Sequence, residues 1–452
     1  MQKWLPLQQR TWRAVIQRRA PCRNRFSTLR DAKHVAVRCA SSGEITVSLH
    51  NVSRHEAAHP LMIWIPPFSF LDGYDPKLQL PPRWLRKFPT AIINYRWPGF
   101  VPDSDSSPAT GTNGDEGGPN IPLHWPTAAH DVAFGYKWIV DNLTPPDLAR
   151  RDIYVFGSYL GASLAASLAL TETHTHKPMA VRGLVTYNGI YDWTTLLPDH
   201  PIHKIRSSGS TSAKPASLAS LLHSINRDLA EPEPEEEDED PTPFALLHQQ
   251  APALFQSPAN LFDPFASPSL LFHTPAIHIP PTFDQPLVPA TSALSEAVDL
   301  LATTPPATDP VPDTDPDTYN DLEPPPRKSH LIFPPRKSTL RIPASLLLFD
   351  DFPPRLPRRL SRRPRDGFKP QAGELADLMI RSVELVELRE RMQWDHEFED
   401  PEARAAEAEA RVRLAGVGAD AEGGGEAGLG VFDLNGEGER AVEEWLAERV
   451  GY

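Results

Sequence analysis

Cysteine is nearly absent from this 452-residue chain, which contains only Cys22 and Cys39. Two cysteines cannot build a disulfide framework, and they lack the paired spacing of a zinc site. Apolar runs are short, and none approaches the roughly 20 residues that span a bilayer. The net charge of −14 excludes a broad basic surface for nucleic acid. We therefore expect no transmembrane segment, no nucleic-acid partner, no metal site and no cofactor.

Proline, in contrast, is abundant, with 51 residues, and much of the excess lies in residues 201–340. That segment also contains the acidic run Glu231–Pro241, which repels itself and cannot bury surface. We expect a largely disordered insertion that could serve as an arm for a protein partner. Two apolar islands within it, at 244–255 and 268–281, are expected to dock on the folded domain.

The first 30 residues are rich in arginine and contain no acidic residue before Asp31. On a helical wheel, Trp12, Val15 and Ile16 fall opposite several arginines. This pattern is typical of a mitochondrial targeting presequence, and it predicts delivery to the matrix. A basic tail on a cytoplasmic protein is the alternative.

Short apolar runs of strand length alternate with helical patterns along the rest of the chain. A strand or a hairpin is expected near 35–51, and strands are expected near 61–67, 90–97, 152–157, 181–190, 342–351 and 428–435. Helices are expected near 124–143, 163–170, 374–393, 402–414 and 438–450. This alternation predicts an α/β fold with a mostly parallel central sheet and helices on both faces. Residues 35–200 and 341–452 would form its two parts, separated by the insertion.

Three motifs in the first part carry a resemblance to a known family. They are "INYRWPG" at 93–99, "HWPTAAHDVAFGYKWIVDNL" at 124–143 and "IYVFGSYLGASLAASLAL" at 153–170. Their order and gaps resemble those of the α/β-hydrolases, in particular the hormone-sensitive-lipase-like branch. The resemblance implies a nucleophile elbow, a tight turn between a strand and a helix that presents the catalytic serine. Members of that family hydrolyse carboxylic esters.

The expected elbow lacks its serine. Aligning Gly157 and Gly161 with the glycines of the family motif puts Tyr159 in the serine position. A phenol has a pKa near 10 on a long rigid side chain, and it cannot reproduce the position of a serine hydroxyl. Ser158 and Ser163 remain as candidate nucleophiles, although capping and packing roles suit them better.

The other catalytic groups are also missing from their expected places. In the family a glycine-rich segment supplies oxyanion-hole amides, whereas this chain has Pro66, Pro67 and Phe68. The acid position falls near Asp350 and Asp351, which we expect to form a strand-end turn.

No histidine follows His396, which stands among acidic residues and is expected on the surface. His174 and His176 have a spacing that could suit a metal, but a polar loop at a helix end is the better interpretation.

Two hypotheses follow. The first is a catalytically inactive α/β-hydrolase-like protein that acts in mitochondria as a binding or scaffold protein, with a pocket that could hold a small apolar ligand. The second is an active carboxylesterase or lipase-like serine hydrolase of atypical geometry. It would use Ser158 or Ser163 with a histidine from the insertion, such as His273 or His278.

Overall fold

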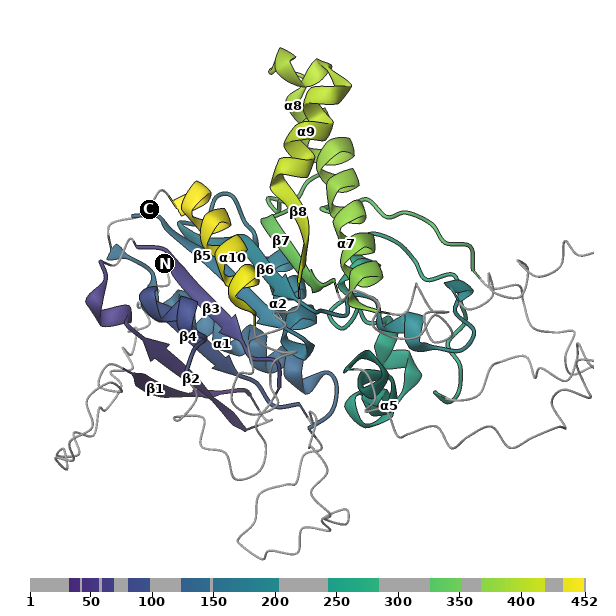
Figure 1. Cartoon of the computed structure of the whole chain (residues 1–452), viewed down its shortest axis with the longest axis horizontal. Helices are drawn as coiled ribbons and strands as arrows, with labels where there is room; N and C mark the ends of the chain where they lie inside the picture. Colours follow the sequence, from purple (N-terminus) through teal and green to yellow (C-terminus); the bar gives the residue numbers. More distant parts are fainter. Residues whose placement is uncertain are drawn as a thin grey trace, which may run out of the picture.

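The computed structural model describes most of the two predicted parts and two pieces of the segment between them (Figure 1). The described residues are 32–40, 43–56, 59–68, 80–97, 123–146, 149–202, 243–283, 326–351, 367–418 and 434–450. The presequence-like residues 1–30 and the acidic run Glu231–Pro241 lie outside them.

One eight-stranded sheet organises the chain, with the strand order β1-β2-β4-β3-β5-β6-β7-β8. The β1–β2 and β2–β4 pairs are antiparallel, and every other pair is parallel. This mostly parallel arrangement confirms the predicted fold class. The strands are β1 (Lys33–Arg38), β2 (Glu44–His50), β3 (Leu61–Ile65), β4 (Thr90–Asn94), β5 (Arg151–Ser158), β6 (Met179–Tyr187), β7 (Ala344–Asp350) and β8 (Val412–Val417).

Helices cover both faces of this sheet (Figure 1). On one face the core includes side chains of α1 (Thr127–Leu143), α2 (Leu160–Glu172) and α7 (Phe368–Ser382). On the other face α10 (Gly436–Val450) packs with the short 3₁₀ turn η3 (Arg83–Lys87). Every residue of α2 from Leu160 to Leu170 is buried, as expected for a helix that is apolar on all sides.

The C-terminal elements differ from the sequence prediction. The strand next to β7 is β8, whose residues were predicted as the end of an exposed helix; the strand predicted at 428–435 lies mostly outside the described residues. Helix α9 (Pro401–Arg411) is capped by the Asp400 carboxylate and stops where β8 begins to pair with β7. Helix α7 begins earlier than predicted, and after Ser382 the chain passes through a π-helical turn (Val383–Leu388) and α8 (Arg389–Arg391).

Part of the proline-rich segment is packed onto the domain, as predicted for the apolar islands. Helix α5 (Pro243–Phe255) ends at Phe255, whose ring lies 4.9 Å from Trp193 and 5.4 Å from Trp97. The Trp97 indole donates to the Leu254 carbonyl at 2.9 Å. Burial of large aromatic surfaces is a major stabilising term, so this contact fixes residues 243–283 to the domain.

Within the described ranges, no helix is both long enough and apolar enough to cross a bilayer.

A buried histidine near the edge of the sheet makes the stability of the fold sensitive to acid. His50, in β2, is 8% exposed, and its Nε2 has no hydrogen-bond partner among the described residues. Burial, with smaller contributions from His34 and Arg86, lowers the pKa of His50 to about 4. A histidine in the unfolded chain has a pKa near 6.5, so the unfolded state binds the proton more readily.

We predict that the free energy of unfolding decreases as the pH falls from about 6.5 to about 4, and that His50→Leu makes this dependence shallower. The difference between the two pKa values of His50 contributes up to about 3 kcal/mol to the free energy of unfolding. This contribution is fully present above the unfolded-state pKa and is lost as the pH falls to the folded-state pKa. Denaturant unfolding at pH 7 and pH 4.5 measures the effect. His176→Leu, at an exposed histidine, is the matched control; equal pH dependence in both variants would contradict the prediction.

Candidate functional site

The turn between β5 and α2 has the outline that the family resemblance implies. Tyr159 separates the strand from the helix, with φ 54° and ψ −119°. Its N–H donates to the Tyr187 carbonyl at 3.0 Å, and its carbonyl accepts from Ala162 N–H at 3.1 Å. A positive φ is strained for an aromatic residue, so the surrounding contacts must hold it there. In a nucleophile elbow, the residue at this strained strand-to-helix position is the nucleophile.

Two glycines allow the backbones at this turn to approach closely. A Cβ on Gly157 would lie 2.4 Å from the Gly161 carbonyl oxygen and 2.7 Å from the Ala165 Cβ. A Cβ on Gly161 would lie 2.3 Å from the Pro66 carbonyl oxygen and 2.4 Å from that of Ile65. The first turn of α2 therefore rests directly on the segment that follows β3.

That segment is the one expected to supply oxyanion-hole amides. Pro66 and Pro67 carry no N–H, and the Pro66 carbonyl accepts a hydrogen bond from the Tyr95 hydroxyl at 2.9 Å. The Phe68 ring follows and lies edge-on to the Tyr159 ring, with centroids 5.4 Å apart. The structure thus places a carbonyl and an aromatic ring beside the turn.

The Tyr159 side chain is buried against two aromatic rings. Tyr159 is 1% exposed. Its ring centroid lies 6.2 Å from that of Phe368, the first residue of α7, so its two aromatic neighbours come from different segments. Burial raises the pKa of the Tyr159 phenol, so the group stays neutral at physiological pH. A neutral, enclosed phenol is a poor nucleophile.

The two serine candidates are both buried, at 1% exposure each. Ser158 is the last residue of β5 and pairs with Tyr187 of β6. Ser163 lies in the first turn of α2, where its hydroxyl donates to the Leu160 carbonyl at 3.0 Å. This local bond within the helix is the packing role that the sequence favoured for Ser163.

The acid candidates separate into a buried and an exposed carboxyl group. Asp350, at the end of β7, accepts hydrogen bonds from the Tyr187 hydroxyl and from the Asn188 amide, the latter at 2.8 Å. Burial raises its pKa, and these two hydrogen bonds act in the opposite direction. Asp351 is exposed and lies 3.3 Å from the Lys369 ammonium. Asp350 is thus the last residue of a strand and not part of the expected turn, and its hydrogen bonds join the ends of β6 and β7.

The histidine candidates lie in separate places. His396 pairs with Glu399 at 2.7 Å on the surface, and that carboxylate raises the pKa of His396. His174 is hydrogen-bonded to the Thr339 hydroxyl at 2.9 Å, with the His176 ring beside it. His273 is buried, and a carboxylate oxygen of Glu374 lies 3.6 Å from its Nε2. His278 lies in the same segment and is half-buried.

A serine–imidazole hydrogen bond does occur elsewhere, between Ser48 Oγ and His34 Nδ1 at 2.8 Å. These residues face each other across the β1–β2 pair, and β2 is paired on its other side with β4. Strand amides around a fully buried Ser48 are engaged in the sheet ladders and cannot converge on a substrate oxygen.

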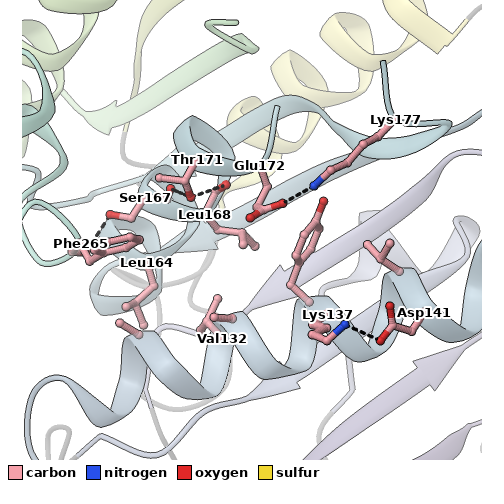
Figure 2. A pocket seen from close by; sticks show the side chains of 14 residues that line it. Val132, Lys137, Asp141, Leu164, Ser167, Leu168, Thr171, Glu172, Lys177 and Phe265 are labelled. Atoms are coloured by element: carbon pink, nitrogen blue, oxygen red, sulfur yellow. Dashed lines mark hydrogen bonds and ion pairs between the residues drawn. The ribbon is translucent and has the colours of Figure 1, made fainter. Parts of the chain in front are cut away.

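A groove of about 480 Å³ lies on the helical layer, between α1 and α2 (Figure 2). Val132, Leu164, Leu168 and Phe265 line its apolar part. Two ion pairs lie at its edges: Lys137–Asp141 within α1 at 2.9 Å, and Glu172 at the end of α2 with Lys177 of the following turn at 3.4 Å. The groove is amphipathic and lies outside the aromatic cluster around Tyr159.

No protein-family model matches the chain, and no curated protein matches it. Similar solved structures include EstE1, a thermostable carboxylesterase cloned from a metagenomic library, at 17% identity and a TM-score of 0.30 over 53% of this chain and 64% of EstE1. Carboxyl esterase 2 of the fungus Tuber melanosporum has 12% identity and a TM-score of 0.40 over 94% of this chain and 88% of its own. A fungal esterase structure from Rhizomucor miehei has 13% identity and a TM-score of 0.37 over 92% of this chain and 82% of its own. The chain spans less than two thirds of EstE1.

Gly161→Ala is predicted to destabilise the fold by about 1–3 kcal/mol, because the added methyl group would meet two backbone carbonyls that cannot move independently. Thermal or denaturant unfolding measures the change. The matched control is Gly373→Ala in α7, where a Cβ would meet nothing within 4 Å. That substitution is expected to be neutral or to stabilise by about 0.5–1 kcal/mol. A Gly161→Ala protein as stable as the parent would contradict this packing.

Proposed function

We propose that this protein is a catalytically inactive member of the α/β-hydrolase superfamily that acts as a binding or scaffold protein. One observation carries the proposal: Tyr159 occupies the strained position between β5 and α2, and its ring is enclosed by Phe68 and Phe368. The turn keeps the backbone shape that would present a nucleophile, but the side chain there has neither the reach nor the reactivity of a serine.

The neighbouring groups support the same proposal. Pro66 and Pro67 remove two amide donors from the segment on which α2 rests, and loss of a single oxyanion-hole donor typically costs about 3 kcal/mol of barrier stabilisation. The carboxyl group of Asp350 is hydrogen-bonded to Tyr187 and Asn188, so its partners are a phenol and an amide. These are independent departures from what acyl transfer requires.

A binding role suits the rest of the chain. Residues 243–283 are fixed to the domain through Phe255 and Trp193, and they lie between long proline-rich stretches of sequence. We infer that the fold serves as a rigid platform from which the proline-rich and acidic segment engages a protein partner. The amphipathic groove between α1 and α2 offers a place for a small, largely apolar ligand.

A fluorophosphonate probe tests the proposal on the full chain, together with hydrolysis of a short-chain nitrophenyl ester. We expect no labelling above that of the heat-denatured protein and no ester hydrolysis above buffer, with an active serine hydrolase as the positive control. Labelling that disappears in Ser158→Ala or Ser163→Ala would support the alternative of an active esterase with atypical geometry. Labelling lost in Ser48→Ala would also contradict the proposal.

We further propose that residues 1–30 deliver the protein to the mitochondrial matrix, as their arginine-rich, acid-free composition favours. Fused to a fluorescent reporter, residues 1–29 are expected to direct the signal to mitochondria. The control fusion carries Arg10→Glu, Arg13→Glu and Arg18→Glu, which reverse the charge of the polar face and should abolish delivery. A diffuse signal from the unmodified fusion would defeat this proposal and favour a cytoplasmic location.

A further inference from the structure

Three side chains from distant parts of the sequence converge near the C-terminal ends of the strands. Asp192 follows β6 and caps a short 3₁₀ turn (Trp193–Leu196), His273 follows another (Pro268–Leu271), and Glu374 lies on α7. One donor atom from each of the three lies within 4.8 Å of the other two. The cluster connects the sheet, the docked part of the proline-rich segment and α7.

Most of this cluster is buried. Asp192 and His273 are each 2% exposed, and the Glu374 side chain is 35% exposed. Two carboxylate groups close together in a poorly solvated place repel each other. The Lys328 ammonium, 2.8 Å from Glu374 Oε1, is 46% exposed and approaches from the solvent side.

The imidazole of His273 is oriented as a ligand would be. Its Nδ1 lies 3.2 Å from the Thr274 carbonyl, an acceptor, which assigns the ring proton to Nδ1 and leaves a lone pair on Nε2. Nε2 is buried with no hydrogen-bond partner among the described residues, and Glu374 Oε1 at 3.6 Å is beyond normal hydrogen-bond length. Histidines that bind metals usually donate their other N–H in this way, often to a backbone carbonyl.

Further hydrogen bonds hold Asp192 in place. The Asp192 carboxylate accepts from the Thr194 N–H at 3.0 Å and from its hydroxyl at 2.5 Å. Gln371, one helical turn before Glu374, accepts from the Asp192 N–H at 2.9 Å and donates to its carbonyl at 3.2 Å. Asp192 is therefore positioned by the fold before any ion binds, as a metal site requires of its ligands.

We propose that Asp192, His273 and Glu374 bind one divalent first-row transition-metal ion, for which Zn²⁺ is the fitting probe. An imidazole nitrogen with two carboxylate oxygens suits such ions, whereas Mg²⁺ and Ca²⁺ prefer oxygen ligands throughout. Three protein ligands leave a position for water beside the half-exposed Glu374. The ion would join three segments of the chain, and this inference does not depend on the protein being inactive.

The test is a Zn²⁺ titration of the chelator-stripped full chain in competition with a chromophoric indicator. We expect one tight equivalent, which equimolar Mg²⁺ does not displace. His273→Gln and Glu374→Gln should each weaken it by more than the roughly 10- to 100-fold that loss of an outer-shell partner costs. His396→Gln, at the exposed His396–Glu399 pair, is the matched control and should retain it.

Lys328→Met is a further variant for the same titration, and it leaves all three ligands in place. It removes the ammonium that competes for Glu374 Oε1, so the apparent affinity for Zn²⁺ should rise. The parent chain binding no tight equivalent would overturn the proposal. Glu374 is half-exposed, so the Glu374→Gln variant is expected to fold. An unchanged Zn²⁺ affinity in that variant would overturn the proposal as well.

Discussion

The contact between the first turn of α2 and the segment after β3 controls the geometry of the candidate site. Gly161 has no room for a Cβ because the Ile65 and Pro66 carbonyl oxygens occupy that space. This contact fixes the start of α2 over the sheet and keeps Tyr159 at a positive φ. Backbone strain of this kind costs about 1–3 kcal/mol, and hydrogen bonds to Tyr187 and Ala162 together with buried aromatic packing offset it.

Strained backbone of this kind is usually retained where a site needs a side chain aimed outward. Here the aimed side chain is a large ring, and Phe68 and Phe368 close around it. The position has thereby become part of the core that joins the sheet to α7. We interpret the turn as a structural feature of this core.

The sequence predicted the sheet and the turn because their signals are local. The run Leu61–Ile65 is apolar at each position, as parallel strands buried on both faces are, and Gly157 and Gly161 mark the tight turn directly. The position of β8 was missed because Val412–Val417 continues an alanine- and glutamate-rich helix and becomes a strand only by pairing with β7. That pairing is a tertiary effect that local propensity does not contain.

The surroundings of the candidate site were harder to predict for the same reason. Asp350 was identified from its place after a strand, but its partners Tyr187 and Asn188 belong to β6 and the residue after it, far earlier in the chain. The cluster of Asp192, His273 and Glu374 could not be found from the sequence either, because these residues share no motif and meet only through the fold. Spacing rules detect ligands that are close in sequence, whereas this cluster draws one residue from each of three segments.

The most direct test of the central claim is fluorophosphonate labelling of the Tyr159→Ser variant. This substitution returns a small hydroxyl to the strained position and opens the space between Phe68 and Phe368. We predict that the variant stays unlabelled, because restoring one side chain does not supply the amide donors and an imidazole base. Covalent labelling of the introduced serine would contradict it, since it would mean that the surrounding catalytic groups are intact and that Tyr159 alone silences them.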